Sequence, residues 1–288
     1  MPQMDPERSQ RGAEEVRGLP AELTLRIASA LALACGALVL GYFGGWPFAV
    51  LIAVVSAAMS WEWSNIVRRG GFDLAFALHI GTACAAILLA AIGQTAFALV
   101  AVAIGIALVA VQQFGRAPVL SSLGVAYVGL PAVALIGLRL DPAHGFAAMM
   151  FVLVMVWTSD TFALIAGKSI GGPKLWPALS PRKTWAGLAG ATLASCIVGG
   201  LFALMLSGGS VALLALTGLT LGLAAQIGDL AESALKRHCG VKDASDLIPG
   251  HGGFLDRMDG VVTAAPLAAL IGLVRNAEAP AQALLFGG

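Results

Sequence analysis

Apolar residues in this chain form long runs that are separated by short polar segments. A helix needs roughly 20 residues to cross the hydrocarbon core of a bilayer, and most of the runs approach this length. They predict about nine spans, near residues 26–43, 46–60, 72–92, 95–111, 119–138, 145–165, 186–206, 211–227 and 261–274. The second and the last are at the short limit for crossing. We therefore expect an all-α, polytopic membrane helix bundle.

Composition agrees with this prediction and excludes a soluble domain. Of the 288 residues, 58% are hydrophobic and 11% are charged, and the mean hydropathy is +0.87. Three of the four cysteines lie inside apolar runs and only Cys239 lies in a polar segment, so the sequence has neither a disulfide framework nor zinc-ligand spacing. The formal net charge is +1, and we expect no nucleic-acid partner.

The positions of the basic residues predict the orientation in the membrane. With nine spans, 15 of the 17 lysines and arginines fall in segments on the same side as the N-terminus, and only Arg139 and Arg275 fall on the other side. Basic residues in short loops are retained in the cytoplasm. The N-terminus and the two longest polar loops are therefore predicted to be cytoplasmic.

Charge and hydropathy also divide the chain into parts. Residues 1–25 mix both charge signs and lack a signal-peptide pattern, so we expect a disordered polar tail. Residues 26–144 hold the N-terminal membrane helices. Residues 145–275 hold further membrane helices and two polar loops, at 166–185 and 229–260. Residues 276–288 are predicted to be a C-terminal tail.

The second polar loop carries six carboxylates and four fixed cations between apolar segments. Charges beside hydrocarbon are costly unless they are paired, hydrated or coordinated, so such a cluster is a candidate site. If the eighth span continues as a helix through Arg237, then Asp229, Ser233 and Lys236 share one helical face and face one ligand. Glu232 and Lys236 have the spacing of an ordinary surface pair, which is the interpretation we favour for Glu232.

Residues 248–253 read IPGHGG, which is incompatible with a regular helix and leaves backbone amides open to an anion. Asp256 and Asp259 follow, three residues apart and near the start of the last span. Mg²⁺ prefers carboxylate oxygens together with substrate phosphates, so we predict Asp229 and Asp256 as metal ligands. Two alternatives stay open, namely a helix cap for Asp259 and a structural role for His251.

The first polar loop is a weaker candidate. Asp160 precedes it, and Lys168 and Lys183 lie among glycines that would let a polyphosphate approach the backbone. Basic residues in a cytoplasmic loop also arise from membrane topology and contact with anionic lipid alone, and this alternative stays open.

The second loop closely resembles the C-terminal motif of the phosphatidate cytidylyltransferase (CDP-diacylglycerol synthase) family. That motif has a Ser, a hydrophobe, Lys-Arg, Lys-Asp, a hydrophobe-Pro, His-Gly-Gly and Asp-Arg-hydrophobe-Asp. The matching positions are Ser233, Leu235, Lys236, Arg237, Lys242, Asp243, Ser245, Ile248, Pro249, His251, Gly252, Gly253, Phe254, Asp256, Arg257, Met258 and Asp259. The first loop is similar to the family's Asp, Gly-Lys and Ser-Pro-x-Lys-Thr pattern. The chain departs from it at Ala186, where many members have an acidic residue.

The resemblance implies transfer of CMP from CTP to phosphatidic acid, giving CDP-diacylglycerol and pyrophosphate, with two Mg²⁺ ions. It also implies a homodimer in a bacterial inner membrane, with the catalytic region at residues 145–275 facing the cytoplasm. Predicted catalytic residues are Asp229, Lys236, Asp256 and Asp259, of which Asp229 and Asp256 would bind metal. Predicted substrate-binding residues are Ser233, Arg237, Lys242, His251, Gly252, Gly253, Arg257, Asp160, Lys168 and Lys183.

Three alternatives remain at this point. Another CTP-dependent lipid transferase or a polyprenol kinase would use similar groups. A transporter would be expected to place its polar residues near the bilayer midplane, whereas here they gather in two loops. The CDP-alcohol phosphotransferases are not among these alternatives, because their Asp-Gly-x-x-Ala-Arg pattern is absent from the sequence.

Overall fold

The computed structural model describes residues 34–70, 72–248 and 252–287. The predicted polar tail, the first part of the predicted first span and His251 lie outside these residues. Within them, eight helices are long and apolar enough to cross a membrane. Their bounds are α2 (Gly45–Arg68), α3 (Leu74–Ala91), α4 (Thr95–Gln112), α5 (Pro118–Arg139), α6 (Gly145–Ser169), α7 (Trp185–Leu204), α8 (Val211–His238) and α9 (Leu255–Arg275). The described part of the predicted first span is the apolar helix Ala34–Phe43.

The prediction of an all-α, polytopic membrane bundle is confirmed. In the described ranges, the sheet is limited to a two-stranded antiparallel hairpin of β1 (Lys174–Trp176) and β2 (Ser180–Thr184). The hairpin lies in the predicted loop 166–185 and leads directly into α7. Thr184 caps α7, because its hydroxyl accepts a hydrogen bond from the Gly187 amide at 3.1 Å.

Three helices, α2, α8 and α9, extend well beyond the spans that hydropathy predicts. The second span was expected to end at residue 60 and the last to begin at residue 261, but α2 continues to Arg68 and α9 begins at Leu255. The short lengths predicted for these two spans are therefore wrong. The conditional prediction that the eighth span runs through Arg237 is confirmed, since α8 ends at His238. Hydropathy falls at the first polar residues, whereas these helices continue because their polar side chains find partners inside the bundle.

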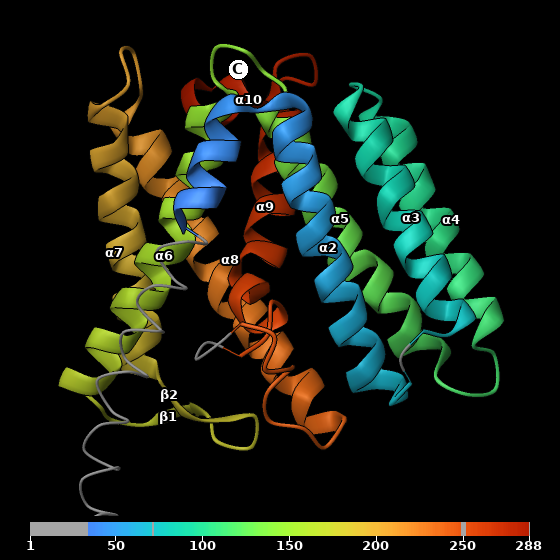
Figure 1. Cartoon of the computed structure of the whole chain (residues 1–288). Coiled ribbons are helices and arrows are strands. Elements are labelled where there is room, and N and C mark those ends of the chain that lie inside the picture. Colours follow the sequence, from blue (N-terminus) through green and yellow to red (C-terminus); the bar gives the residue numbers. More distant parts are fainter. Residues whose placement is uncertain (1–33, 71, 249–251, 288) are drawn as a thin grey trace, which may run out of the picture.

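Both polar loops lie at the same end of the bundle, the lower end in Figure 1. The described residues of the C-terminal segment lie at the opposite end. There the predicted tail 276–288 contains a short helix, α10 (Pro280–Phe286), whose Ala281, Leu284 and Leu285 are fully buried. Among the described basic residues, only Arg139 and Arg275 lie at that end, as the basic-residue pattern predicts.

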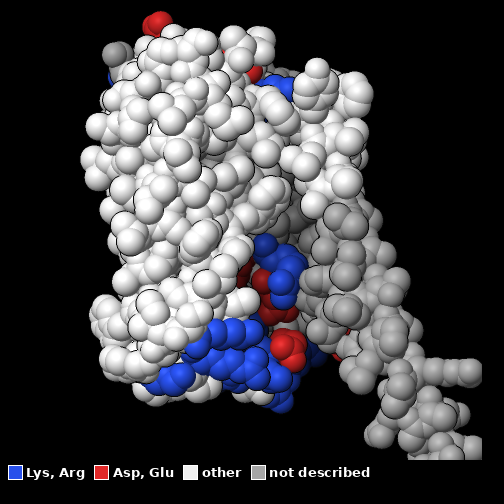
Figure 2. All heavy atoms as spheres, turned by 90° about the vertical axis from the view of Figure 1, so that its left-hand side faces the viewer, with Lys and Arg blue, Asp and Glu red and all other residues white. Residues whose placement is uncertain are grey.

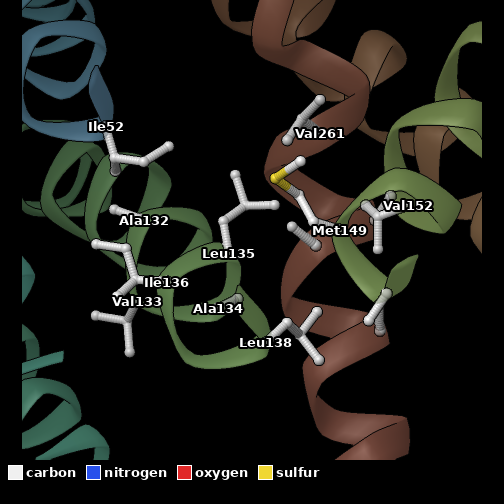
Figure 3. Packing of buried hydrophobic residues seen from close by; sticks show 14 of the residues in the cluster. Ile52, Ala132, Val133, Ala134, Leu135, Ile136, Leu138, Met149, Val152 and Val261 are labelled. Carbon is white, nitrogen blue, oxygen red and sulfur yellow. The ribbon is translucent and has the colours of Figure 1, made fainter. Parts of the chain in front are cut away.

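The core lies where α5, α6 and α9 meet. Leu135 and Leu138 of α5 face Met149 and Val152 of α6, with Val261 of α9 beside them (Figure 3). These side chains are almost completely buried. The packing fixes α9 in the middle of the bundle, and the first turns of α9 carry the predicted site residues.

Glycines bring α7 and α8 into close contact. A methyl group added at Gly218 of α8 would lie 2.5 Å from the Ser195 carbonyl oxygen of α7. Small residues allow this approach in membranes, where apolar side chains gain little by leaving lipid. The contact holds α8 against the α6–α7 side of the site.

Replacing this glycine tests the packing. We expect Gly218→Ala to destabilise the protein by about 1–3 kcal/mol, because the methyl group forces the two helices apart. Gly81→Ala is the matched control. Gly81 also lies within a helix, α3, but a methyl group added there would meet no atom of another helix within 4 Å. Thermal unfolding in detergent should show a lower midpoint for Gly218→Ala alone. Equal midpoints for the two variants would contradict the close contact.

Candidate active site

A cavity of about 810 Å³ opens at the end of the bundle that carries both polar loops. Its walls come from α6, the β1–β2 hairpin, α7, α8, the following loop and the start of α9. Figure 2 shows the side of the bundle that lies on the left in Figure 1. Acidic and basic side chains gather there in a hollow near the lower end, and the surface above them is almost free of charge. The predicted residues that line the cavity are Asp160, Lys183, Asp229, Ser233, Lys236, Gly252, Asp256, Arg257 and Asp259. The shared face predicted for Asp229, Ser233 and Lys236 is therefore confirmed.

Three carboxylates meet on the cavity wall. Oxygens of Asp229, Glu232 and Asp259 all lie within 4.8 Å of one another. The first two come from α8 and the third from α9. The helices can approach here because Gly228 has no side chain, and a methyl group at this position would collide with the Asp259 carbonyl oxygen. The Thr263 hydroxyl adds a link by donating to the Ala224 carbonyl at 2.6 Å.

Two lysines form ion pairs with the carboxylates of the cavity wall. Lys236 Nζ lies 2.8 Å from Glu232 Oε2 and 2.6 Å from Asp256 Oδ1, and so joins α8 to the first turn of α9. Lys183 Nζ of β2 lies 2.7 Å from Asp229 Oδ2. The predicted Glu232–Lys236 pair exists, but its assignment to the surface is wrong, because Glu232 is only 2% exposed.

The carboxylate cluster fits a hard divalent cation. Glu232 Oε1 is buried and has no hydrogen-bond partner among the described groups, although buried polar atoms are normally paired. Carboxylate oxygens are the donors that Mg²⁺ takes from proteins. The orphaned oxygen and its two acidic neighbours therefore suit an ion bound between α8 and α9.

Asp256 shares the Lys236 ammonium with Glu232 of the cluster, and it also accepts hydrogen bonds from backbone amides. Its Oδ1 accepts from Lys236, and its Oδ2 accepts from the amides of Ala244 at 3.2 Å and Gly253 at 2.9 Å. Nitrogen donors thus surround a residue predicted to bind metal, and that role stays a prediction. Asp259 does not cap α9, because the N-cap position is Phe254 and Asp259 Oδ1 accepts a hydrogen bond from the adjacent Gly260 amide.

A polar link on the cavity wall joins α6 to α8. Gln226 Nε2 donates to Ser159 Oγ at 3.0 Å and to Asp160 Oδ1 at 3.3 Å, and Ser159 Oγ donates to the Gly222 carbonyl at 2.9 Å. Gln226 was not singled out from the sequence, because a single amide within an apolar run gives no distinctive signal. Its contact fixes the direction in which Asp160 faces the cavity.

Four predicted substrate residues in the described chain do not line the cavity. Lys168 and Lys242 are exposed, and Gly253 is buried behind Asp256. Arg237 is exposed, and its Nε donates a long hydrogen bond of 3.4 Å to the Leu179 carbonyl of the hairpin. The fifth, His251, lies outside the described residues. The cavity also includes Arg182, Asp243 and Asp246, which the motif comparison did not assign to substrate.

Comparison with known proteins identifies the family of the chain. Residues 24–274 match the pattern described as the cytidylyltransferase family. A phosphatidate cytidylyltransferase from Brucella abortus biovar 1 (strain 9-941) is 38% identical over 256 residues, covering 88% of this chain and 94% of the relative. Phosphatidate cytidylyltransferases from Bacillus subtilis (strain 168) and Staphylococcus saprophyticus are 39% and 40% identical over 147 residues, covering 50% of this chain and 54% and 55% of those relatives. The predicted resemblance is confirmed, and the chain belongs to the cytidylyltransferase family.

Proposed function

We propose that this protein is a phosphatidate cytidylyltransferase, which transfers CMP from CTP to phosphatidic acid and releases pyrophosphate. The Brucella relative that carries this name aligns with 88% of the chain. The observation that carries the proposal is the cavity that combines clustered carboxylates with lysines and arginines at one end of the membrane bundle. Such a site suits two anionic reactants, because fixed cations and a metal ion offset their mutual repulsion.

The position of the cavity suits one soluble substrate and one lipid. Ala163 and Leu164 of α6 and Leu188 of α7 line it beside the charged groups. An apolar wall within membrane-spanning helices allows a lipid headgroup to enter while its acyl chains stay in the bilayer. CTP would enter from the water at the loop end. From the distribution of basic residues, we infer that this end faces the cytoplasm of a bacterial inner membrane.

We propose that Asp229, Glu232 and Asp259 hold a Mg²⁺ ion. When bound there, the ion would neutralise charge on the substrate phosphates and help to bring them together. A second ion at Asp256 would have to replace the Lys236 ammonium at Oδ1, so we treat that predicted ligand as part of a separate site. The homodimer implied by the family resemblance also stays a prediction.

The chain's own residues would act mainly by positioning and by electrostatic stabilisation. An oxygen of the lipid phosphate forms a bond to the α-phosphorus of CTP, and the bond between that phosphorus and the α–β bridging oxygen breaks. The nucleophile is already an anion at neutral pH, so no strong general base is needed. Arg182, Lys183 and Arg257 line the cavity and would stabilise the charge that develops on the leaving pyrophosphate.

Labelled CTP distinguishes this reaction from that of a lipid kinase. In liposomes that contain phosphatidic acid and Mg²⁺, label from the α-phosphate should enter the lipid and label from the γ-phosphate should not. Asp229→Ala should lower the rate by at least about a hundredfold, because it removes a proposed metal ligand. Asp256→Ala should lower the rate because it releases the Lys236 ammonium that also pairs with Glu232. Glu278→Gln at the opposite end is a control for loss of one exposed carboxylate. Transfer of the γ-label would contradict cytidylyl transfer and favour a kinase.

A second experiment tests the metal ligands. Glu232→Gln keeps the shape of the side chain but removes a charged oxygen from the cluster, so it should weaken Mg²⁺ binding by about 10–100-fold. Mn²⁺ binding to the purified variant, followed by electron paramagnetic resonance without substrates, measures this directly. Asp256→Asn should change Mn²⁺ binding less than Glu232→Gln does. The reverse order would support the metal ligand predicted from the sequence and contradict the cluster.

A further inference from the structure

Glu62 is a charged residue buried on a helix that does not line the cavity. It lies on α2 and is 0% exposed, while the cavity walls come from α6 to α9 and their loops. Within the described part of the chain, the ion pairs of the cavity involve other carboxylates. Burial of a carboxylate is strongly unfavourable unless hydrogen-bond donors replace its water. Its partners therefore indicate its role.

Three donors from the second polar loop and α9 converge on Glu62. The Ser245 hydroxyl donates to Oε1 at 2.5 Å, and the Phe254 amide donates to the same oxygen at 2.9 Å. The Leu255 amide donates to Oε2 at 2.7 Å. Phe254 and Leu255 are the N-cap and first residue of α9, which has no side-chain cap of its own at Phe254. Glu62 thus caps α9 from a different helix and gains from the positive end of its dipole.

Glu62 and Asp256 bind alternate donors of the same two segments. Asp256 accepts from the Ala244 and Gly253 amides, whereas Glu62 accepts from the neighbouring Ser245, Phe254 and Leu255. Each carboxylate therefore joins the middle of the connection between α8 and α9 to its end. The fit is tight, since a methyl group added at Gly253 would lie 2.6 Å from Glu62 Oε1.

This contact reaches the proposed metal cluster through a short path. Leu255, whose amide Glu62 binds, is followed directly by Asp256, and Asp259 lies one helical turn further along α9. A displacement of the first turn of α9 would move Asp256 away from Lys236 and Asp259 away from Asp229. Catalytic sites lose activity when supporting groups release the ligands that they orient.

We propose that Glu62 is a positioning residue for the reaction. It holds Ser245 and the first turn of α9 in place, and through them it sets where Asp256 and Asp259 lie relative to α8. The effect on catalysis rests on the proposed function, whereas the effect on the loop does not.

The test compares Glu62→Gln with Ser60→Ala. Gln has the same size as Glu, but one of the two carboxylate oxygens becomes an NH2 group. This group cannot accept a hydrogen bond from the donors that Glu62 binds, so at least one of the hydrogen bonds is lost. Ser60 is also fully buried on α2, but among the described residues its hydroxyl bonds within that helix alone, to the Ser56 carbonyl at 2.7 Å. Hydrogen exchange of full-length protein in detergent should be faster in residues 244–258 of Glu62→Gln and unchanged in Ser60→Ala.

Activity and partner substitution complete the test. Glu62→Gln should lower kcat/KM for CTP by about 10–100-fold and raise the KM, with a thermal midpoint close to that of Ser60→Ala. Ser245→Ala should show a smaller loss of the same kind, and the double variant should lose less than the two single losses combined. This non-additivity would not arise from a general loss of folded protein.

Two results would overturn the proposal. One is unchanged exchange in residues 244–258 together with unchanged kinetics. The other is a lower folded fraction whose remaining enzyme keeps the original KM, since that pattern describes stability alone. If the unsubstituted protein transferred no CMP, the proposed function would fail, and the exchange data would still decide whether Glu62 holds the loop.

Discussion

The bridge made by Lys236 is the interaction on which the candidate site depends. One ammonium group lies within 2.8 Å of carboxylates from two helices, Glu232 of α8 and Asp256 of α9. Without it, two negative charges would lie side by side in a partly buried site, which is strongly unfavourable. Lys236 therefore makes it possible for α8 and α9 to bring their acidic residues together. The same charge arrangement leaves Asp229, Glu232 and Asp259 facing one another.

The membrane sets the second constraint. Groups that bind phosphate must reach water, yet the lipid substrate stays in the bilayer, so the site has to lie where helices end. The structure meets this requirement by extending α8 beyond its apolar part, to His238, and by starting α9 before its apolar part, at Leu255. The charged ends of both helices are then supported by the hairpin, whose Lys183 reaches Asp229.

Sequence patterns predict much of this arrangement. Hydropathy identifies the spans, and helical spacing places Asp229, Ser233 and Lys236 on one face because both depend on local order alone. The Glu232–Lys236 pair is predicted correctly, but its assignment to the surface is wrong for the opposite reason. The i, i+4 spacing is the same on a surface and in an interior, and only the packing of α9 decides that Glu232 is buried.

Glu62 shows a similar limit. In the sequence it is a single carboxylate in the segment WEWSN, where hydropathy suggests merely the end of a span. Its partners are 183, 192 and 193 residues away, so no local pattern reveals them. Long-range contacts of this kind come from the tertiary fold. The closeness of Asp259 to Asp229 depends in the same way on the absence of a side chain at Gly228.

The distance along the chain between Glu62 and its partners also affects the order in which the protein matures. All the described residues that line the cavity lie between Asp160 and Asp259, so this part of the chain contains every described group of the candidate site. It lacks the acceptor that completes the start of α9. During synthesis, α2 is made long before α9. The hydrogen bonds from Phe254 and Leu255 to Glu62 can therefore form only after residue 255 has been synthesised. A separately expressed C-terminal half would contain the residues that line the cavity but would lack Glu62.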